Sequence, residues 1–295
     1  MNKIVSEPFV SIGMPVYNGG DALRAAIDAL LAQTHRAFEL IISDNASTDG
    51  TGEICREYAA RDTRIRYSRN ETNIGGVPNF ERVLYLARHD YFMWAAHDDL
   101  WQPEFIEANL RPLLADPKVI CSMCQALLAE HGRLVVPPIF NPAGTFPLMS
   151  SHVPSNLCKY LLLPGLNARF YGLWRRHVLL DNMPTGDFCS SDVSFVARTL
   201  MQGKIAEVKR RLWIRGSRGM SSDSLRLLRW GERNIVDRFV PLYRFTRDLL
   251  RFREVHESPV VLVALVILNC YFSGWKCKTL AIHSLKKLFR ARNER

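Results

Sequence analysis

Residues 38–51 read FELIISDNASTDGT, an apolar run that passes directly into residues favoured in turns and helix caps. The run FELIIS (38–43) has the length and composition of a buried strand, and DNASTDGT (44–51) leads into a helical pattern. The same order of strand, turn and helix recurs on both sides of it. Further strands are predicted over FVSIGM (9–14), RIRYS (64–68) and DYFMWAA (90–96).

Helices are predicted between these strands. Residues 21–33 carry apolar side chains at helical spacing, and Pro78 and Pro103 each open another helical run. Strands that alternate with helices of this length indicate an α/β fold with a mostly parallel sheet, flanked by helices. Ligands of such sheets bind beyond the carboxyl ends of the strands. Three polar clusters fall there, at Tyr17-Asn18, Asp44-Asn45 and Asp98-Asp99, and together they predict a small-molecule site.

Composition and charge fit this prediction. With 295 residues, 47% hydrophobic and 23% charged, the chain is globular and long enough for one large domain with an appendage or for two small domains. The net charge of +10 is uneven. Residues 204–295 hold 21 Lys and Arg against 8 Asp and Glu, a net of +13, whereas residues 1–203 carry −3. A partner that selects positive charge would therefore meet the last third of the chain.

The seven cysteines indicate a reducing compartment. Their number is odd, and a chain of this size does not need disulfides for stability. Cys121 and Cys124 form a CxxC pair inside the apolar run 119–128, where core packing is favoured over metal or redox use because no second pair completes a zinc site. The first residues, MNKIVSEPFV, lack the long apolar stretch of a secretory signal.

The C-terminal part has the composition of a membrane-associating region. Residues 225–252 alternate apolar side chains with arginines at helical spacing, residues 259–275 are free of charge, and a basic tail follows. The 17-residue apolar segment could span a bilayer, lie in its interface or pack in the core. We expect 225–295 to bind a membrane surface rather than nucleic acid, because no nucleic-acid motif accompanies the basic residues. A solvated helical face is the remaining alternative.

Four strings resemble the inverting glycosyltransferases of family 2, of the bacterial surface-polysaccharide type with the GT-A fold. They are SIGMPVYNGG, ELIISDNASTDGT, NIGGVPNF and YFMWAAHDDLWQPEF, in the family's order and spacing. The resemblance is close over residues 8–125 and weaker to about 220. It implies a glycosyltransferase domain over 1–222, with 223–295 as a helical appendage. It also implies transfer from a nucleotide-diphosphate sugar, with a UDP-sugar favoured, to a glycan or lipid-linked hydroxyl with Mn²⁺ or Mg²⁺ as cofactor.

The resemblance also implies roles for single residues. Asp99 stands at the family's metal-ligand position, and Asp98 would face the ribose or assist the metal, while His97 replaces an acid. A hard dication bound by few carboxylates leaves room for phosphate oxygens, and it offsets charge on the diphosphate leaving group. Other positions match donor contacts: Pro15, Tyr17, Asp44 and Asn45 at the base, with Asn45 in place of a second acid, and Asn73 and Arg82 near the donor.

The resemblance also implies a general base that deprotonates the acceptor hydroxyl, and this role carries over to Asp192. Asp192 lies in the first turn of a predicted helix within SSDVSFVARTLMQGK (190–204). Asp187 is the nearby competitor. Two other functions stay open. One is an inactive sugar-nucleotide-binding or membrane scaffold of the same fold, and the other is a nucleotidyltransferase, which would want basic residues in the loop after the first strand. Because sugar nucleotides are made in the cytosol, we expect a cytoplasmic protein, peripheral on the inner membrane.

Overall fold

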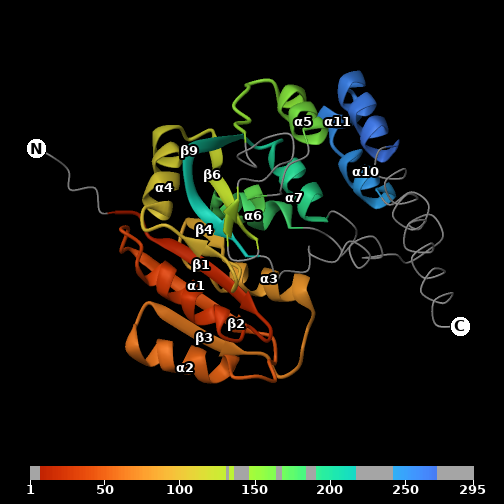
Figure 1. Cartoon of the computed structure of the whole chain (residues 1–295). Coiled ribbons are helices and arrows are strands. Elements are labelled where there is room, and N and C mark those ends of the chain that lie inside the picture. The colour runs from red at the N-terminus through yellow and green to blue at the C-terminus, as the bar shows by residue number, and fades with distance from the viewer. Residues whose placement is uncertain are drawn as a thin grey trace, which may run out of the picture. The chain divides into compact units, whose positions relative to one another are not determined.

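A computed structural model describes residues 7–130, 133–135, 146–163, 168–183, 191–216 and 242–270 (Figure 1). The chain forms two compact units. The first comprises Met1–Ser151, Gly165–Met183 and Gln202–Arg218, and the second His152–Pro164, Pro184–Met201 and Gly219–Arg295. The predicted domain boundary at 222/223 and the basic tail both lie outside the described residues.

The first unit is built on one mixed sheet, which has nine strands within the described residues in the order β3-β2-β1-β4-β8-β6-β9-β5, with β7 paired to β6. Pairs β3/β2, β2/β1, β1/β4 and β6/β9 are parallel, and β8 runs antiparallel between β4 and β6. The prediction of a parallel-rich α/β fold is confirmed. The bounds are β1 Val10–Val16, β2 Phe38–Asp44, β3 Ile65–Arg69, β4 Tyr91–Trp94, β5 Leu100–Trp101, β6 Val119–Glu130, β7 Arg133–Val135, β8 Leu173–Arg175 and β9 Lys204–Arg215.

Helices bury the sheet, so its central strands are apolar throughout. All residues of β1 and β2 are buried, as expected of parallel strands covered on both faces. Helix α3 packs on β1 and β2, α4 packs on β6, and α2 lies along β3 (Figure 1). The helices are α1 Ala22–Leu31, α2 Thr51–Arg61, α3 Gly76–Leu86, α4 Phe105–Ala115, α6 Arg176–Asn182 and the 3₁₀ turn η1 Ala168–Tyr171.

The carboxyl ends of the parallel strands meet at one edge of this sheet. Val16 at the end of β1 is paired with Asp44 at the end of β2, and Asp44 with Arg69 at the end of β3. Backbone hydrogen bonds continue the ladder past the strands, from Asn45 to Val16 (2.8 Å) and from Asn70 to Asp44 (2.8 Å). The loops that hold the predicted site therefore begin side by side.

The second unit is helical in its described part. It contains α5 Val153–Leu162, α7 Ser191–Thr199, α10 Tyr243–Leu249, α11 Arg253–His256 and a helix over 259–270. Helix α7 packs against both α5 and α10. Among the described residues, none of the helices combines the length and apolar character needed to cross a membrane. The predicted apolar segment 259–275 is described through residue 270.

The CxxC pair lies in the core, as predicted. Cys121 and Cys124 are buried free thiols on β6. Burial raises the pKa of both, to about 12 for Cys124. Protonated thiols in an apolar setting are poor nucleophiles and poor metal ligands. In the described part of the chain, no group of three or more His, Cys, Asp or Glu side chains is arranged to hold a metal ion.

Candidate functional site

The loops after β1 and β2 are joined by hydrogen bonds. The backbone N–H of Asn18 donates to Ser47 Oγ (2.9 Å), and Thr48 N–H donates back to Asn18 Oδ1 (2.8 Å). Gly19 N–H donates to Thr51 Oγ1 (2.9 Å). Asn18 has φ 52°, a left-handed conformation that asparagine tolerates. These bonds fix the loop that presents Tyr17, whose side chain is 46% exposed, whereas Pro15 is buried within β1.

Asp44 is completely buried, and both of its carboxylate oxygens accept hydrogen bonds. Oδ1 accepts from Ser47 N–H (2.9 Å), and Oδ2 accepts from Tyr67 Oη (3.0 Å) and Arg69 Nη1 (2.7 Å). Burial alone would raise the pKa of Asp44, but these donors outweigh it and lower the pKa. The carboxylate predicted to meet a base is thus occupied with shaping the loop.

We expect Asp44→Asn to unfold more easily at pH 7, by about 1–3 kcal/mol, because the new amide N–H₂ would face a donor in either orientation, Ser47 N–H or the pair Tyr67 and Arg69. The lowered pKa sets the pH dependence. The ionised Asp44 carboxylate stabilises the fold fully at pH values above its unfolded-state pKa of about 3.9. This stabilisation is lost as the pH falls through the lower folded-state pKa. The stability difference between variant and parent should therefore shrink from pH 7 to pH 3 in urea unfolding.

The matched control is Asp21→Asn, at an exposed helix start with no side-chain capping bond. It should change stability little at either pH. An Asp44→Asn deficit that stays constant across this range would contradict the ionic origin of the effect.

Asn45 holds the loop after β3. Its Nδ2 donates to Asn73 Oδ1 (2.8 Å) and Gly75 O (3.1 Å), and its Oδ1 accepts from Asn70 Nδ2 (3.0 Å) and Ile74 N–H (2.9 Å). Two donors and two acceptor positions of one amide are all used. An aspartate here could accept from Asn70 and Ile74 but could not donate to Asn73 and Gly75. The hydrogen-bond partners around position 45 therefore fit the asparagine of this chain and would not fit the acid of the family pattern.

Asp99 is anchored by β9. It is 2% exposed, its Oδ2 accepts from Trp213 Nε1 (2.9 Å) and its Oδ1 accepts from Gly216 N–H (2.8 Å). Burial raises the pKa of Asp99 to about 7, although these two hydrogen bonds act to lower it. Sequence reasoning missed Trp213 and Gly216, and no local signal identifies them because they lie 114 and 117 residues further along the chain.

Asp98 is the more open acid of the turn. It is partly exposed, and within the described residues its carboxylate makes no hydrogen bond or ion pair. Gly216 runs against it, since a Cβ there would lie 2.7 Å from Asp98 Oδ2. His97 lies near Gly19 of the first loop. Burial lowers the pKa of His97, against the charges of Asp98 and Asp49.

Aromatic side chains in contact with one another connect the two tryptophans beside the acidic turn. Trp213 packs near Tyr171 (centroids 5.7 Å apart), Tyr171 contacts Phe170 edge-on (5.3 Å), and Phe170 stacks on Trp94 (4.5 Å, 7°). Trp94 ends β4, just before the turn. This chain of rings joins both anchors of the turn, Trp94 and Trp213, and should limit its movement.

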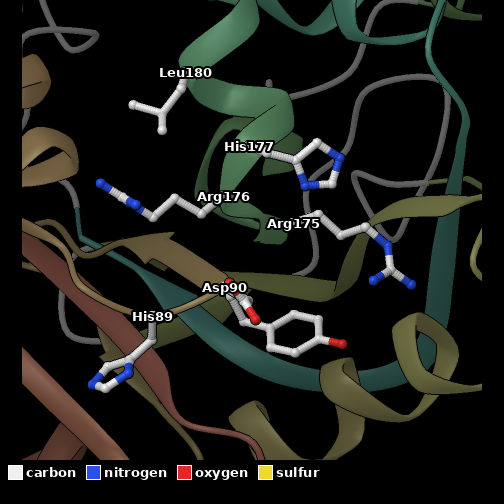
Figure 2. A pocket seen from close by; sticks show the side chains of 7 residues that line it. His89, Asp90, Arg175, Arg176, His177 and Leu180 are labelled. Atoms are coloured by element: carbon white, nitrogen blue, oxygen red, sulfur yellow. The ribbon is translucent and has the colours of Figure 1, made fainter.

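A pocket of about 380 Å³ lies at the opposite end of β4 (Figure 2). Figure 2 shows Arg176 extending to one side, and Arg175 and His177 to the other, so these side chains do not converge. Arg175 donates to the carbonyls of Val119 (2.9 Å) and Leu113 (2.6 Å). Arg175 on β8 thus holds α4 and β6 in place, and the pocket is separate from the predicted site at the carboxyl ends.

The structure brings most predicted donor residues to one edge. Pro15, Tyr17, Asp44, Asn45, Asn73, Asp98 and Asp99 all lie at or beyond the carboxyl ends of β1 to β4. Arg82 lies exposed on α3, which begins at the loop held by Asn45. Asp192 is exposed in the first turn of α7, in the second unit, and Asp187 lies outside the described residues. The roles predicted for all of these residues stay predictions.

Comparison with known proteins identifies the domain. Residues 11–131, from β1 to the end of β6, match the model of glycosyl transferase family 2. The chain contains a family 2 glycosyltransferase domain. Every predicted donor and metal residue falls within this glycosyltransferase domain, and Asp192 falls outside it.

Curated relatives agree with this assignment. The putative teichuronic acid biosynthesis glycosyltransferase TuaG of Bacillus subtilis is 30% identical over 126 residues, which cover 43% of this chain and 50% of the relative. The putative glycosyltransferase EpsE of the same organism is 38% identical over 106 residues, 36% of this chain and 38% of the relative. The chain thus matches half or less of the length of these relatives.

Solved structures show the same fold as the glycosyltransferase domain and its surroundings. S. aureus TarS 1–349 in complex with UDP-GlcNAc has a TM-score of 0.63 at 19% identity, over 87% of this chain and 71% of that one. The mannosyltransferase PcManGT from Pyrobaculum calidifontis, in complex with GDP-Man and Mn²⁺, has a TM-score of 0.57 at 18% identity, over 95% and 81%. The GT-A fold predicted from the sequence is confirmed.

Proposed function

We propose that this protein is an inverting glycosyltransferase. It transfers a sugar from a nucleotide-diphosphate sugar, specifically a UDP-sugar, to a hydroxyl of a glycan or lipid-linked acceptor. The observation that carries the proposal is the family 2 domain, whose loops place the partly exposed Asp98 at the carboxyl edge of the sheet. In α/β folds this is the edge where ligands bind.

A divalent cation, Mn²⁺ or Mg²⁺, fits the acids of this turn. Such cations take oxygen ligands and often bind through one or two carboxylates plus substrate phosphates. We assign the direct contact to Asp98, because its carboxylate is not engaged by the described residues. Asp99, the expected ligand, instead receives Trp213 and Gly216 on its two oxygens, and we assign it the role of positioning the turn. When bound, the cation would offset charge on the diphosphate.

The nucleoside would lie against Tyr17 and the adjoining loops. Tyr17 presents an exposed ring on a fixed loop. Asp44 accepts a hydrogen bond from Ser47 in the adjoining loop, and Asn45 donates one to Asn73 in the loop after β3, so both side chains hold these loops in place. Two similar structures contain different nucleotide sugars, UDP-GlcNAc and GDP-Man. We propose uridine because the structure with the higher TM-score of these two holds UDP-GlcNAc, and Arg82 remains a proposed donor contact.

Sugar transfer follows as a single displacement. The acceptor oxygen forms a bond to the anomeric carbon as the bond from that carbon to the diphosphate oxygen breaks, and the electron pair leaves with the diphosphate. The acceptor proton passes to the carboxylate of Asp192, whose negative charge is favoured in the first turn of α7. Attack opposite the leaving group inverts the anomeric centre.

The acceptor and the place of action are inferred from the chain's charge. A membrane-borne acceptor would suit a protein whose residues 204–295 carry a net +13, and one relative is named for teichuronic acid biosynthesis. We propose action at the cytoplasmic face of the membrane, where nucleotide sugars are available.

Isothermal titration calorimetry of the full chain with UDP tests the proposal. We expect binding that needs Mn²⁺, and weaker binding of GDP. Release of UDP from UDP-sugars in the presence of Mn²⁺ would then exclude an inactive scaffold. Binding of neither nucleotide with Mn²⁺ would overturn the proposed function, and preference for GDP would overturn the choice of base.

A further inference from the structure

The helix over residues 259–270 has two apolar faces. One face is buried, with residues at most 8% exposed: Val261, Ala264, Leu265 and Leu268. The other is open to solvent, with side chains between 52% and 65% exposed: Val260, Val263, Val266 and Ile267. We call these four residues the valine stripe. Their spacing of three, six and seven residues puts them on one side of the helix.

Specific bonds fix the rotation of this helix. Asn269 Nδ2 donates to Thr246 Oγ1 (2.7 Å) on α10 and to Leu265 O (2.8 Å). Helix α10 is in turn tied to α7, where Ser194 Oγ donates to Asp248 Oδ2 (2.7 Å). Turning the helix to bury the stripe would break the bond to Thr246 and expose the packed face. The stripe is therefore held outward.

An outward row of β-branched aliphatic side chains calls for an apolar partner. The charge of the adjoining sequence indicates which one. Residues 271–295 contain seven Lys and Arg against the single acid Glu294. A second copy of the chain would bring like charges together, whereas anionic headgroups would attract them. The sequence also continues with Tyr271 and Trp275, residue types enriched at the membrane interface.

We propose that the valine stripe inserts into the interfacial layer of an anionic phospholipid bilayer, with the helix lying along the surface. Of the three placements open from the sequence, this one accounts for both faces. A fully buried core helix would leave no stripe exposed, and a spanning helix would not keep one face buried and its hydrogen bond to Thr246 on α10. The inference goes beyond sugar transfer and does not depend on it.

Vesicle flotation of the full chain tests the proposal. Wild-type protein should float with vesicles of phosphatidylcholine and phosphatidylglycerol in a 3:1 ratio, and much less with phosphatidylcholine alone. The double variant Val263→Asp/Val266→Asp should bind at least tenfold more weakly. The milder pair Val263→Thr/Val266→Thr keeps side-chain shape and should give an intermediate loss. Leu114→Asp, on the exposed side of α4 in the first unit, is the matched control and should bind like wild type.

Three results would overturn the proposal. The Val263→Asp/Val266→Asp variant could bind vesicles as well as wild type, or it could lose no more binding than the Leu114→Asp control. The third is a wild-type dimer in light scattering that the Val263→Asp/Val266→Asp variant converts to a monomer. Mn²⁺-dependent UDP binding should be the same in the aspartate variant and wild type. Failure of membrane binding and failure of the proposed enzyme function are therefore separate outcomes.

Discussion

Asp98→Asn is expected to abolish the Mn²⁺ dependence of donor binding and to lower sugar transfer about a thousandfold. A neutral amide is a far poorer ligand for a hard dication than a carboxylate. Stabilising the diphosphate leaving group through a cation contributes several kcal/mol to such a reaction, and about 4 kcal/mol corresponds to a factor of a thousand. Calorimetry with UDP at several Mn²⁺ concentrations and a transfer assay measure the two effects.

Asp99→Asn is the matched comparison, because it makes the same chemical change one residue away. Its amide would point N–H₂ at either Trp213 Nε1 or Gly216 N–H, so one donor in the buried site loses its acceptor. We expect a loss of about 1–3 kcal/mol in unfolding free energy, with partial loss of transfer. Asp98→Asn should unfold like wild type. The opposite pattern, with Mn²⁺ response lost only in Asp99→Asn and stability unchanged, would restore Asp99 as the ligand.

The sequence predicts the framework of the proposed donor site well, because that framework depends on short-range patterns. The four predicted strands coincide with β1 to β4 to within two residues at each end. Apolar runs of this length between helical segments can be buried only in a covered sheet. Turn residues follow each run, so the clusters at Tyr17, Asp44 and Asp98 necessarily reach the same edge of parallel strands.

What each side chain does at that edge is not predictable in the same way. The sequence predicts that Asp44 and Asn45 contact the nucleobase, and it does not show their partners Arg69, Asn70 and Asn73, which lie 25 to 28 residues away in sequence. Asp99 differs from Asp98 only through β9, which returns more than a hundred residues later. Two adjacent aspartates look equivalent in a sequence, and only tertiary contacts show which one is buried.

The C-terminal part shows the same limit for helices. The uncharged run 259–275 is compatible with a core, an interface or a span, because hydrophobicity alone does not say which face meets which partner. Burial within the described residues separates the packed face at Val261 and Leu265 from the open face at Val263 and Val266. The bond from Asn269 to Thr246, which fixes this division, has no signature in the apolar pattern.

Asp192→Asn should leave Mn²⁺-dependent donor binding unchanged and lower sugar transfer by a factor of about 100 to 10,000. The amide has nearly the shape of the carboxylate but cannot take the acceptor proton, and general-base catalysis contributes about this much. Asp192 belongs to the second unit and lies outside the family 2 domain, so its loss should not disturb the donor loops. Single-turnover transfer with saturating UDP-sugar measures the chemical step.

Asp187→Asn and Asp21→Asn complete this experiment. Asp187 is the other acid that precedes α7 in sequence, and Asp21 is an exposed acid at the start of α1. We expect both variants to transfer sugar at close to the wild-type rate. Normal transfer by Asp192→Asn together with loss in Asp187→Asn would move the base to Asp187. Weaker donor binding in Asp192→Asn would instead show that its carboxylate acts on the donor rather than on the acceptor hydroxyl.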